Sequence, residues 1–220
     1  MPRRLWIALL VLALAAPTLA QARQLYPVDE GPRDPSFLRF RQRLIAAAKQ
    51  RDRRYIYSIV DPKIRWSFGA DTGKQGFKQH WTEAAPGALE TELIQILSLG
   101  GEFNSKGEFW APYVFSHWPD QFDAFEHQAI TGKNVSIRQR PGLAAPVIVR
   151  LSYEIVKRAP DPSPAQSGKS SDPGEWVKIV TPAGRQGFVA AGYVRSPIDY
   201  RACFKKRGGR WWMTVLVAGD

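Results

Sequence analysis

The sequence predicts an α+β protein built from two units, and three observations lead to this prediction. Apolar residues recur at helical spacing in the first half of the 220-residue chain. From Ile130 onwards the pattern changes to short apolar runs separated by turns rich in Pro and Gly, which is typical of a small β-barrel. Residues 198–220 form two alternating runs joined at Gly208–Gly209, which predicts a β-hairpin.

Residues 1–22 have the features of a secretory signal peptide. Two arginines precede the apolar run Leu5–Ala16, and small residues follow, so cleavage is expected after Ala20 or Ala22. The apolar run is too short to act as a stable membrane anchor. We therefore expect a periplasmic or secreted protein with no transmembrane anchor after cleavage.

Residues 23–129 are predicted to form an N-terminal α+β domain that is rich in helix. A lead-in of Pro and charged residues precedes a helix that begins at Phe37, with Ser36 as its expected cap. The following elements are a short helix at 55–59, a strand at 63–68, helices at 76–81 and 89–99, and an extended aromatic segment at 107–119. Gly100 and Gly101 are expected to end the last helix.

Residues 130–197 are predicted to form one barrel of short strands, near 134–138, 146–151, 154–158, 175–180, 186–190 and 193–195. The segment 159–174 between the third and fourth strands contains mostly Pro, Ser, Gly and Asp. It has almost nothing to bury, so we expect a mobile hairpin loop within the barrel rather than a linker. The C-terminal hairpin at 198–220 lies outside this unit, and we expect it to pack on the N-terminal domain.

The barrel region resembles the bacterial SH3 domain family over residues 130–197. The family pattern has a valine-rich strand followed by Arg and a Pro turn, then Trp, apolar, Lys, apolar, then a glycine turn, and finally Gly, aromatic, Val and Tyr. These features fall here at Val135, Ile137, Arg138, Pro141, Trp176, Val177, Lys178, Ile179, Gly184, Gly187, Phe188, Val189, Tyr193 and Val194. We expect the rings of Trp176, Phe188 and Tyr193 to pack together and anchor the barrel core.

The resemblance implies a binding role, because members of this family often bind cell-wall peptides or target wall enzymes. Aromatic side chains with a basic rim suit a peptide that carries carboxylates. The candidate ligand-binding residues are Arg138, Arg140, Tyr153, Trp176 and Arg195. The alternative is that Trp176 and Tyr153 only pack the barrel.

The rest of the chain has a second, weaker resemblance to ketosteroid-isomerase-like cone domains. It rests on the early helical segment "RLIAAAKQRDRRYIYSIVDPKIRWSFG" and the terminal strands "DYRACFKKRGGRWWMTVLVAG". The resemblance implies a cone into which the barrel is inserted, with a pocket that binds or transforms a small molecule. Asp52 and Asp61 are then the candidate carboxylates, although Asp61 before Pro62 is also typical of a turn. An unclassified α+β domain is the alternative.

The net charge of +11 bears on the partners. Outside the cytoplasm we expect no nucleic acid, so the basic surface favours peptidoglycan, another anionic envelope component or an envelope protein. Solvated charged faces are the alternative explanation. We expect no cofactor.

Candidate catalytic groups are few. Cys203 is the only cysteine, and no histidine follows it, which argues against a cysteine peptidase whose base lies later in the chain. Asp120, Asp123 and His127 have a spacing that would place them on one face of a helix as metal ligands, although a helix beginning at Pro119 explains the same pattern without a metal. The sequence therefore predicts an exported envelope-binding protein rather than an enzyme.

Overall fold

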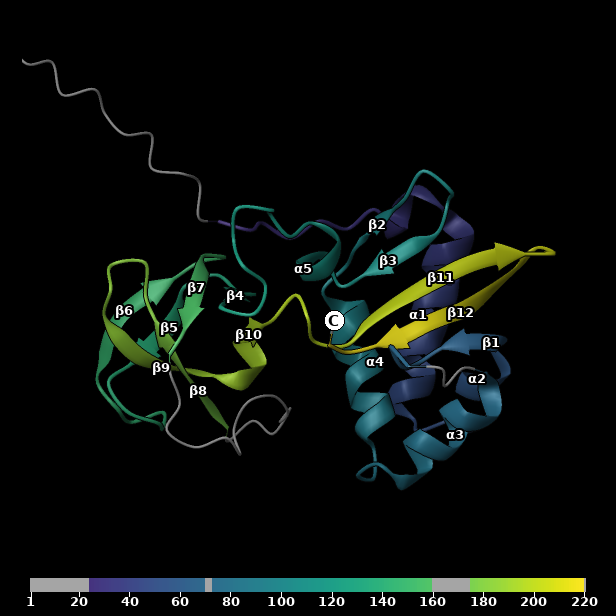
Figure 1. Cartoon of the computed structure of the whole chain (residues 1–220), viewed down its shortest axis with the longest axis horizontal. Helices are drawn as coiled ribbons and strands as arrows, with labels where there is room; N and C mark the ends of the chain where they lie inside the picture. The colour runs from purple at the N-terminus through teal and green to yellow at the C-terminus, as the bar shows by residue number, and fades with distance from the viewer. Residues whose placement is uncertain (1–23, 70–72, 160–174, 220) are drawn as a thin grey trace, which may run out of the picture.

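A computed structural model describes residues 24–69, 73–159 and 175–219, so the expected signal peptide and nearly all of the expected loop 159–174 lie outside the described residues. Within these ranges the chain is a mixed α+β structure with five α-helices and two β-sheets (Figure 1). This confirms the predicted class. None of the helices in the same ranges is long and apolar enough to cross a membrane.

The helices lie almost entirely in the first half of the chain. They are α1 (Pro35–Lys49), α2 (Arg53–Ser58), α3 (Lys74–Glu83), α4 (Ala88–Ser98) and α5 (Tyr113–Ser116), with 3₁₀ turns at Gly31–Arg33 and Ala191–Tyr193. The predicted extended segment 107–119 is wrong in its second half, because it contains α5. The helix considered from Pro119 is also absent, since residues 119–126 form only turns and bends.

The cap predicted for the first long helix is at the wrong residue. The carboxylate of Asp34 accepts hydrogen bonds from the backbone N–H groups of Ser36 at 2.7 Å and Phe37 at 3.1 Å, so Asp34 is the N-cap of α1. The hydroxyl of Ser36 instead accepts from Trp211 Nε1 at 3.0 Å. This contact ties the start of α1 to the C-terminal strand.

The first sheet combines strands from both ends of the chain. Its order is β1 (Val60–Arg65), β12 (Arg210–Val217), β11 (Arg201–Arg207), β3 (Phe109–Ala111) and β2 (Glu102–Phe103). The last strand, β12, pairs in parallel with β1, while the C-terminal hairpin also pairs with β3 through β11. Helices α1 and α4 cover one face of this sheet (Figure 1). We call the sheet and helices α1–α4 the first unit.

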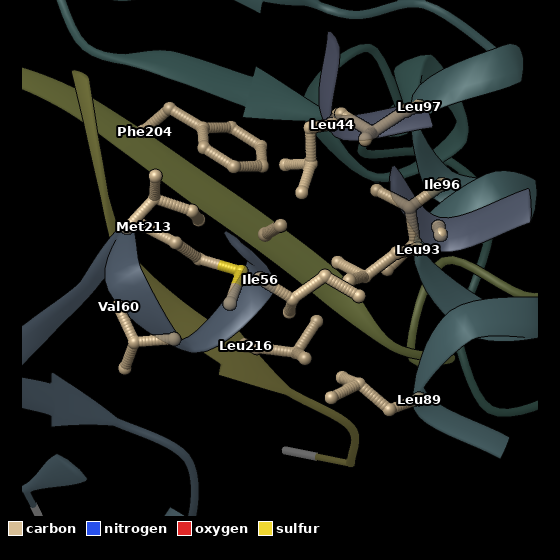
Figure 2. Close-up of a cluster of buried hydrophobic side chains, with 14 of the residues drawn as sticks. Leu44, Ile56, Val60, Leu89, Leu93, Ile96, Leu97, Phe204, Met213 and Leu216 are labelled. Atoms are coloured by element: carbon tan, nitrogen blue, oxygen red, sulfur yellow. The ribbon is translucent and has the colours of Figure 1, made fainter. Parts of the chain in front are cut away.

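The core of the first unit lies between the sheet and its helices. Leu44, Ile56, Leu93, Met213 and Leu216 are fully buried and meet there from helices and strands (Figure 2). Aromatic rings fill the end of the same core, where Phe37 contacts the rings of five neighbours, namely Phe40, Phe103, Phe109, Phe204 and Trp211. The helical spacing in the sequence is explained by this core.

The second sheet contains seven antiparallel strands, and we call it the second unit. Its order is β10 (Val194–Arg195), β4 (His127–Ile130), β7 (Ile155–Arg158), β8 (Trp176–Val180), β9 (Gln186–Ala190), β5 (Val135–Arg138) and β6 (Val147–Leu151). Six of these strands match the predicted ones closely, whereas β4 was not predicted. All seven strands contribute to one apolar cluster.

The second core is aliphatic, which contradicts the prediction of three packed rings. Its buried members are Ile130, Val135, Ile137, Leu151, Val156, Ile179 and Val189. Trp176 and Phe188 are only half-buried, Tyr193 is 54% exposed, and no ring contact found in the described residues joins any two of them. Strand alternation explains the error, since Val189 and Ile179 point inwards and their neighbours therefore point outwards.

The two units meet across a third apolar cluster and a strap from the N-terminal segment. Leu25 and Tyr113 of this cluster pack against Ala129 and Ile155 of the second sheet. The backbone of Leu25 donates to Tyr153 O at 2.7 Å, and the backbone of Glu30 donates to Gly101 O at 2.8 Å. The strap, residues 24–30, thereby contacts both units.

Candidate ligand-binding surface

Four side chains form a strip on the outer face of the second sheet. In β8, Ile179 lies in the core, so Trp176 and Lys178 project from the other face. Lys178 pairs directly with Phe188 of β9, and Phe188 pairs with Arg138 of β5. Residues directly opposite one another in paired strands share a face. We call Arg138, Trp176, Lys178 and Phe188 the outer strip.

The outer strip places an aromatic ring between two cations. Phe188 stands between Lys178 and Arg138 across three strands, and Trp176 lies two residues along β8 from Lys178. All four side chains are partly exposed. Such an arrangement can stack on a flat or apolar ligand surface while the cations pair with its carboxylates.

A loop contact positions Arg138. Its Nη1 donates to the carbonyl oxygen of Ala145 at 2.6 Å, which holds the guanidinium against the loop between β5 and β6. A guanidinium has five N–H donors, and this hydrogen bond uses one of them. Arg140 follows in this loop and is exposed.

Two predicted site residues lie elsewhere. Tyr153 faces the strap, where its ring centroid is 5.7 Å from that of Tyr26. Its backbone has a positive φ of 65° and accepts a hydrogen bond from Leu25. Tyr153 therefore does not join the outer strip.

Arg195 is buried at the junction between the units. Its side chain is 7% exposed, and Nη2 donates to Glu92 Oε1 and to Tyr200 O, both at 2.6 Å. Nη1 donates to Gln95 Oε1 at 3.1 Å. These partners come from α4 and the segment before β11, so Arg195 joins the second unit to the first and is not open to a ligand.

Lys178 and Phe188 are site residues that sequence reasoning did not select. Both were part of the family resemblance, but Phe188 was assigned to the core. The sequence did carry a signal for the outward position of Phe188. Gly187 and Val189 alternate with Phe188 along β9, so when these two residues face the core, Phe188 must face away from it.

The candidate catalytic groups all have structural partners. Cys203 is buried, and this burial raises the pKa of its thiol to about 11, so the reactive thiolate is scarce at neutral pH. Asp52 caps α2 by accepting from Tyr55 N at 2.9 Å. Asp61 accepts from Lys63 N at 2.7 Å, as expected for a turn, and forms an ion pair with Arg207.

Two of the residues considered as metal ligands, Asp123 and His127, also have local roles. Asp123 accepts from the backbone of Phe125 and Glu126, and His127 Nδ1 lies 3.1 Å from Asp123 O. Across the described ranges, no three His, Cys, Asp or Glu side chains gather where they could hold a metal ion.

The first unit contains one cavity of interest, with a volume of about 260 Å³. Its lining is Arg51, Arg53, Thr82, Ala84, Pro86, Gly87 and Glu90. Arg53 Nε donates to Glu90 Oε1 at 2.7 Å, so two of the charges in the lining neutralise one another. This lining combines charged side chains with small apolar residues, and so differs from the mainly apolar pocket expected of a ligand-binding cone domain.

Comparisons with known proteins give no family for this chain: no family model, no curated protein and no solved structure matches it.

Proposed function

We propose that this chain is an exported, non-enzymatic protein of the bacterial envelope that binds peptidoglycan through the outer strip. The single observation that carries the proposal is the alignment of Arg138, Phe188 and Lys178 across three neighbouring strands. Peptidoglycan combines sugar rings, which stack on aromatic side chains, with peptide carboxylates, which pair with cations. The expected signal peptide supports access to this polymer.

We further propose that the second unit is a bacterial SH3-like barrel. Support comes from seven antiparallel strands around one aliphatic core, together with the resemblance over residues 130–197. The close approach at Gly187 also supports a strongly curved sheet. A Cβ at this position would lie 2.6 Å from Ile137 Cγ2 and 2.7 Å from Ile148 Cδ1.

For the first unit we propose a cone-like architecture that serves as a scaffold. The parallel pairing of β1 with the final strand and the helices on one sheet face support this proposal. The space between helices and sheet is occupied by fully buried side chains such as Phe37, Leu44 and Met213. This packing favours a supporting role over a small-molecule pocket.

Sedimentation with purified peptidoglycan sacculi tests the proposed function. The chain from residue 23 should sediment with sacculi, and the bound fraction should fall as salt rises because exposed charge pairs are screened. The Arg138→Gln/Lys178→Gln variant should bind roughly tenfold more weakly, since it removes two charge-assisted contacts. Trp176→Ala/Phe188→Ala should weaken binding through lost stacking, with little dependence on salt.

A matched control removes the same charge elsewhere. Lys49→Gln/Lys106→Gln replaces two exposed lysines of the first unit and should leave retention unchanged. Circular dichroism checks that every variant is folded. Equal retention of the strip variant and this control, or no retention of the parent protein, would contradict the proposal.

A further inference from the structure

A second group of basic side chains surrounds the tip of the β11–β12 hairpin. Arg210 lies at its centre, where Nη2 donates to Ser58 O at 2.8 Å. Its charge also acts on Tyr55 of α2 and on Lys74 of α3. We call Arg43, Lys74, Lys78, Arg207 and Arg210 the hairpin patch. Its members come from α1, α3 and the hairpin, and lie in a different unit from the outer strip.

Aromatic rings alternate with the cations of the hairpin patch. The guanidinium of Arg210 lies 4.5 Å from the ring centroid of Trp212, and that of Arg207 lies 5.9 Å from it. Arg43 lies 4.4 Å from the ring of Tyr55, and Lys78 Nζ lies 5.2 Å from that of Tyr57. The three rings are half-buried.

Carboxylates neutralise little of this charge. Arg207 pairs with the buried Asp61, but no ion pair found in the described residues joins Arg43, Lys74, Lys78 or Arg210 to an acid. The pKa of Lys74 is lowered, first by burial and then by the charges of Lys78 and Arg210. Like charges held this close repel one another and destabilise the free protein. A polyanionic partner would relieve the repulsion.

We propose that the hairpin patch docks on the surface of an anionic phospholipid bilayer. Phosphate headgroups lie in one plane and can meet cations from three elements at once, and the hairpin tip extends beyond the helices (Figure 1). Trp and Tyr rings prefer the membrane–water interface because they have an apolar body and a polar tip. The inference rests on the proposed export in one respect only: export decides which membrane the protein reaches.

Vesicle co-sedimentation of the chain from residue 23 tests this docking. Vesicles of phosphatidylcholine with about a third phosphatidylglycerol should retain the protein at low salt, whereas pure phosphatidylcholine should not. Lys74→Gln/Lys78→Gln should weaken binding roughly tenfold to thirtyfold, given the contribution of each basic residue near an anionic surface. Trp212→Ala should reduce the vesicle binding that remains at high salt, because the electrostatic attraction is screened there and the ring carries more of the binding.

The control Lys106→Gln/Lys133→Gln removes two exposed lysines outside the hairpin patch and should bind vesicles like the parent. Equal binding of this control and the α3 variant would overturn the inference. So would equal binding to neutral and anionic vesicles, or binding to soluble polyphosphate with none to vesicles.

The hairpin patch and the outer strip can fail separately. Lys74→Gln/Lys78→Gln should retain sacculus binding, and Arg138→Gln/Lys178→Gln should retain vesicle binding. A parent protein that binds sacculi but not anionic vesicles would overturn the docking inference alone, and the reverse result would overturn the proposed function alone.

Discussion

The two units use aromatic residues in opposite ways. In the first unit, Phe37, Phe109 and Phe204 are fully buried between sheet and helices, and Trp211 is nearly so. In the second unit the buried core consists of Ile, Val and Leu, while Trp176 and Phe188 lie on the outer face. A sheet covered by helices has a thick interior that large rings fill. Within the described ranges the second sheet has no such helical cover, and the side chains on its inner face are small enough to pack closely against one another.

This difference separates the aromatic rings that stabilise the fold from those that are free to bind a ligand. A ring that is buried contributes through the apolar area removed from water. A ring that remains half-exposed between two cations contributes little to folding and is free to contact a ligand. Half-buried rings, such as Trp176 and Phe188 in the second unit and Trp212 beside the hairpin patch, are therefore better indicators of function than the buried rings.

The same substitution in both units tests this comparison most strongly. Phe37→Ala should lower the free energy of unfolding by about 3–5 kcal/mol, because Phe37 is 0% exposed and contacts five rings. Phe188→Ala should cost only about 1 kcal/mol. Urea unfolding followed by circular dichroism measures both. Similar losses for the two variants would show that Phe188 is a core residue after all.

The junction gives the next largest effect. Arg195→Leu leaves Glu92 and Gln95 without their partner and should destabilise the protein by about 2–4 kcal/mol, since one half of a largely buried ion pair is lost. Glu92→Gln in the same background should recover part of this loss, because it removes the unpaired charge. Urea unfolding of the single and double variants gives the coupling. If the two changes simply add, Arg195 and Glu92 are not coupled and the junction is held by its apolar cluster alone.

Local patterns predicted the elements well and their partners poorly. The helical spacing around Leu44 and the alternation around Val135 each report a buried face, so helices and strands were found near their true positions. The cap was misplaced because Asp34 and Ser36 are both good caps, and only the contact between Ser36 and Trp211 decides between them.

The candidate site was predicted only in part, because local patterns report residue types but not distant partners. Arg138 and Trp176 were selected by residue type, and the register of β5, β9 and β8 brings them to one face. Arg195 has the same chemistry, but a salt bridge to α4 over a hundred residues earlier in the chain removes it from the surface. No local pattern reports such a distant partner. Likewise, the pairings that assemble the hairpin patch are tertiary and have no signature in the sequence.

The smallest effect concerns the glycine beneath the outer strip. A Cβ at Gly187 would meet Ile137 and Ile148 side chains at under 3 Å and the Arg138 carbonyl oxygen at 3.1 Å. Gly187→Ala should therefore cost about 1–3 kcal/mol by overpacking, and it should push β5 away from β9, where Arg138 pairs with Phe188.

Gly192→Ala provides the matched control, because a Cβ there meets nothing within 4 Å. Its stability should change by less than about 0.5 kcal/mol. Sacculus retention should fall for the Gly187 variant even under conditions where it is fully folded, since the strip depends on the spacing between these two strands. If the Gly187 variant is retained as well as the Gly192 variant, binding does not require Arg138 and Phe188 to be held side by side. The residues of the outer strip would then bind as separate charges and not as one surface.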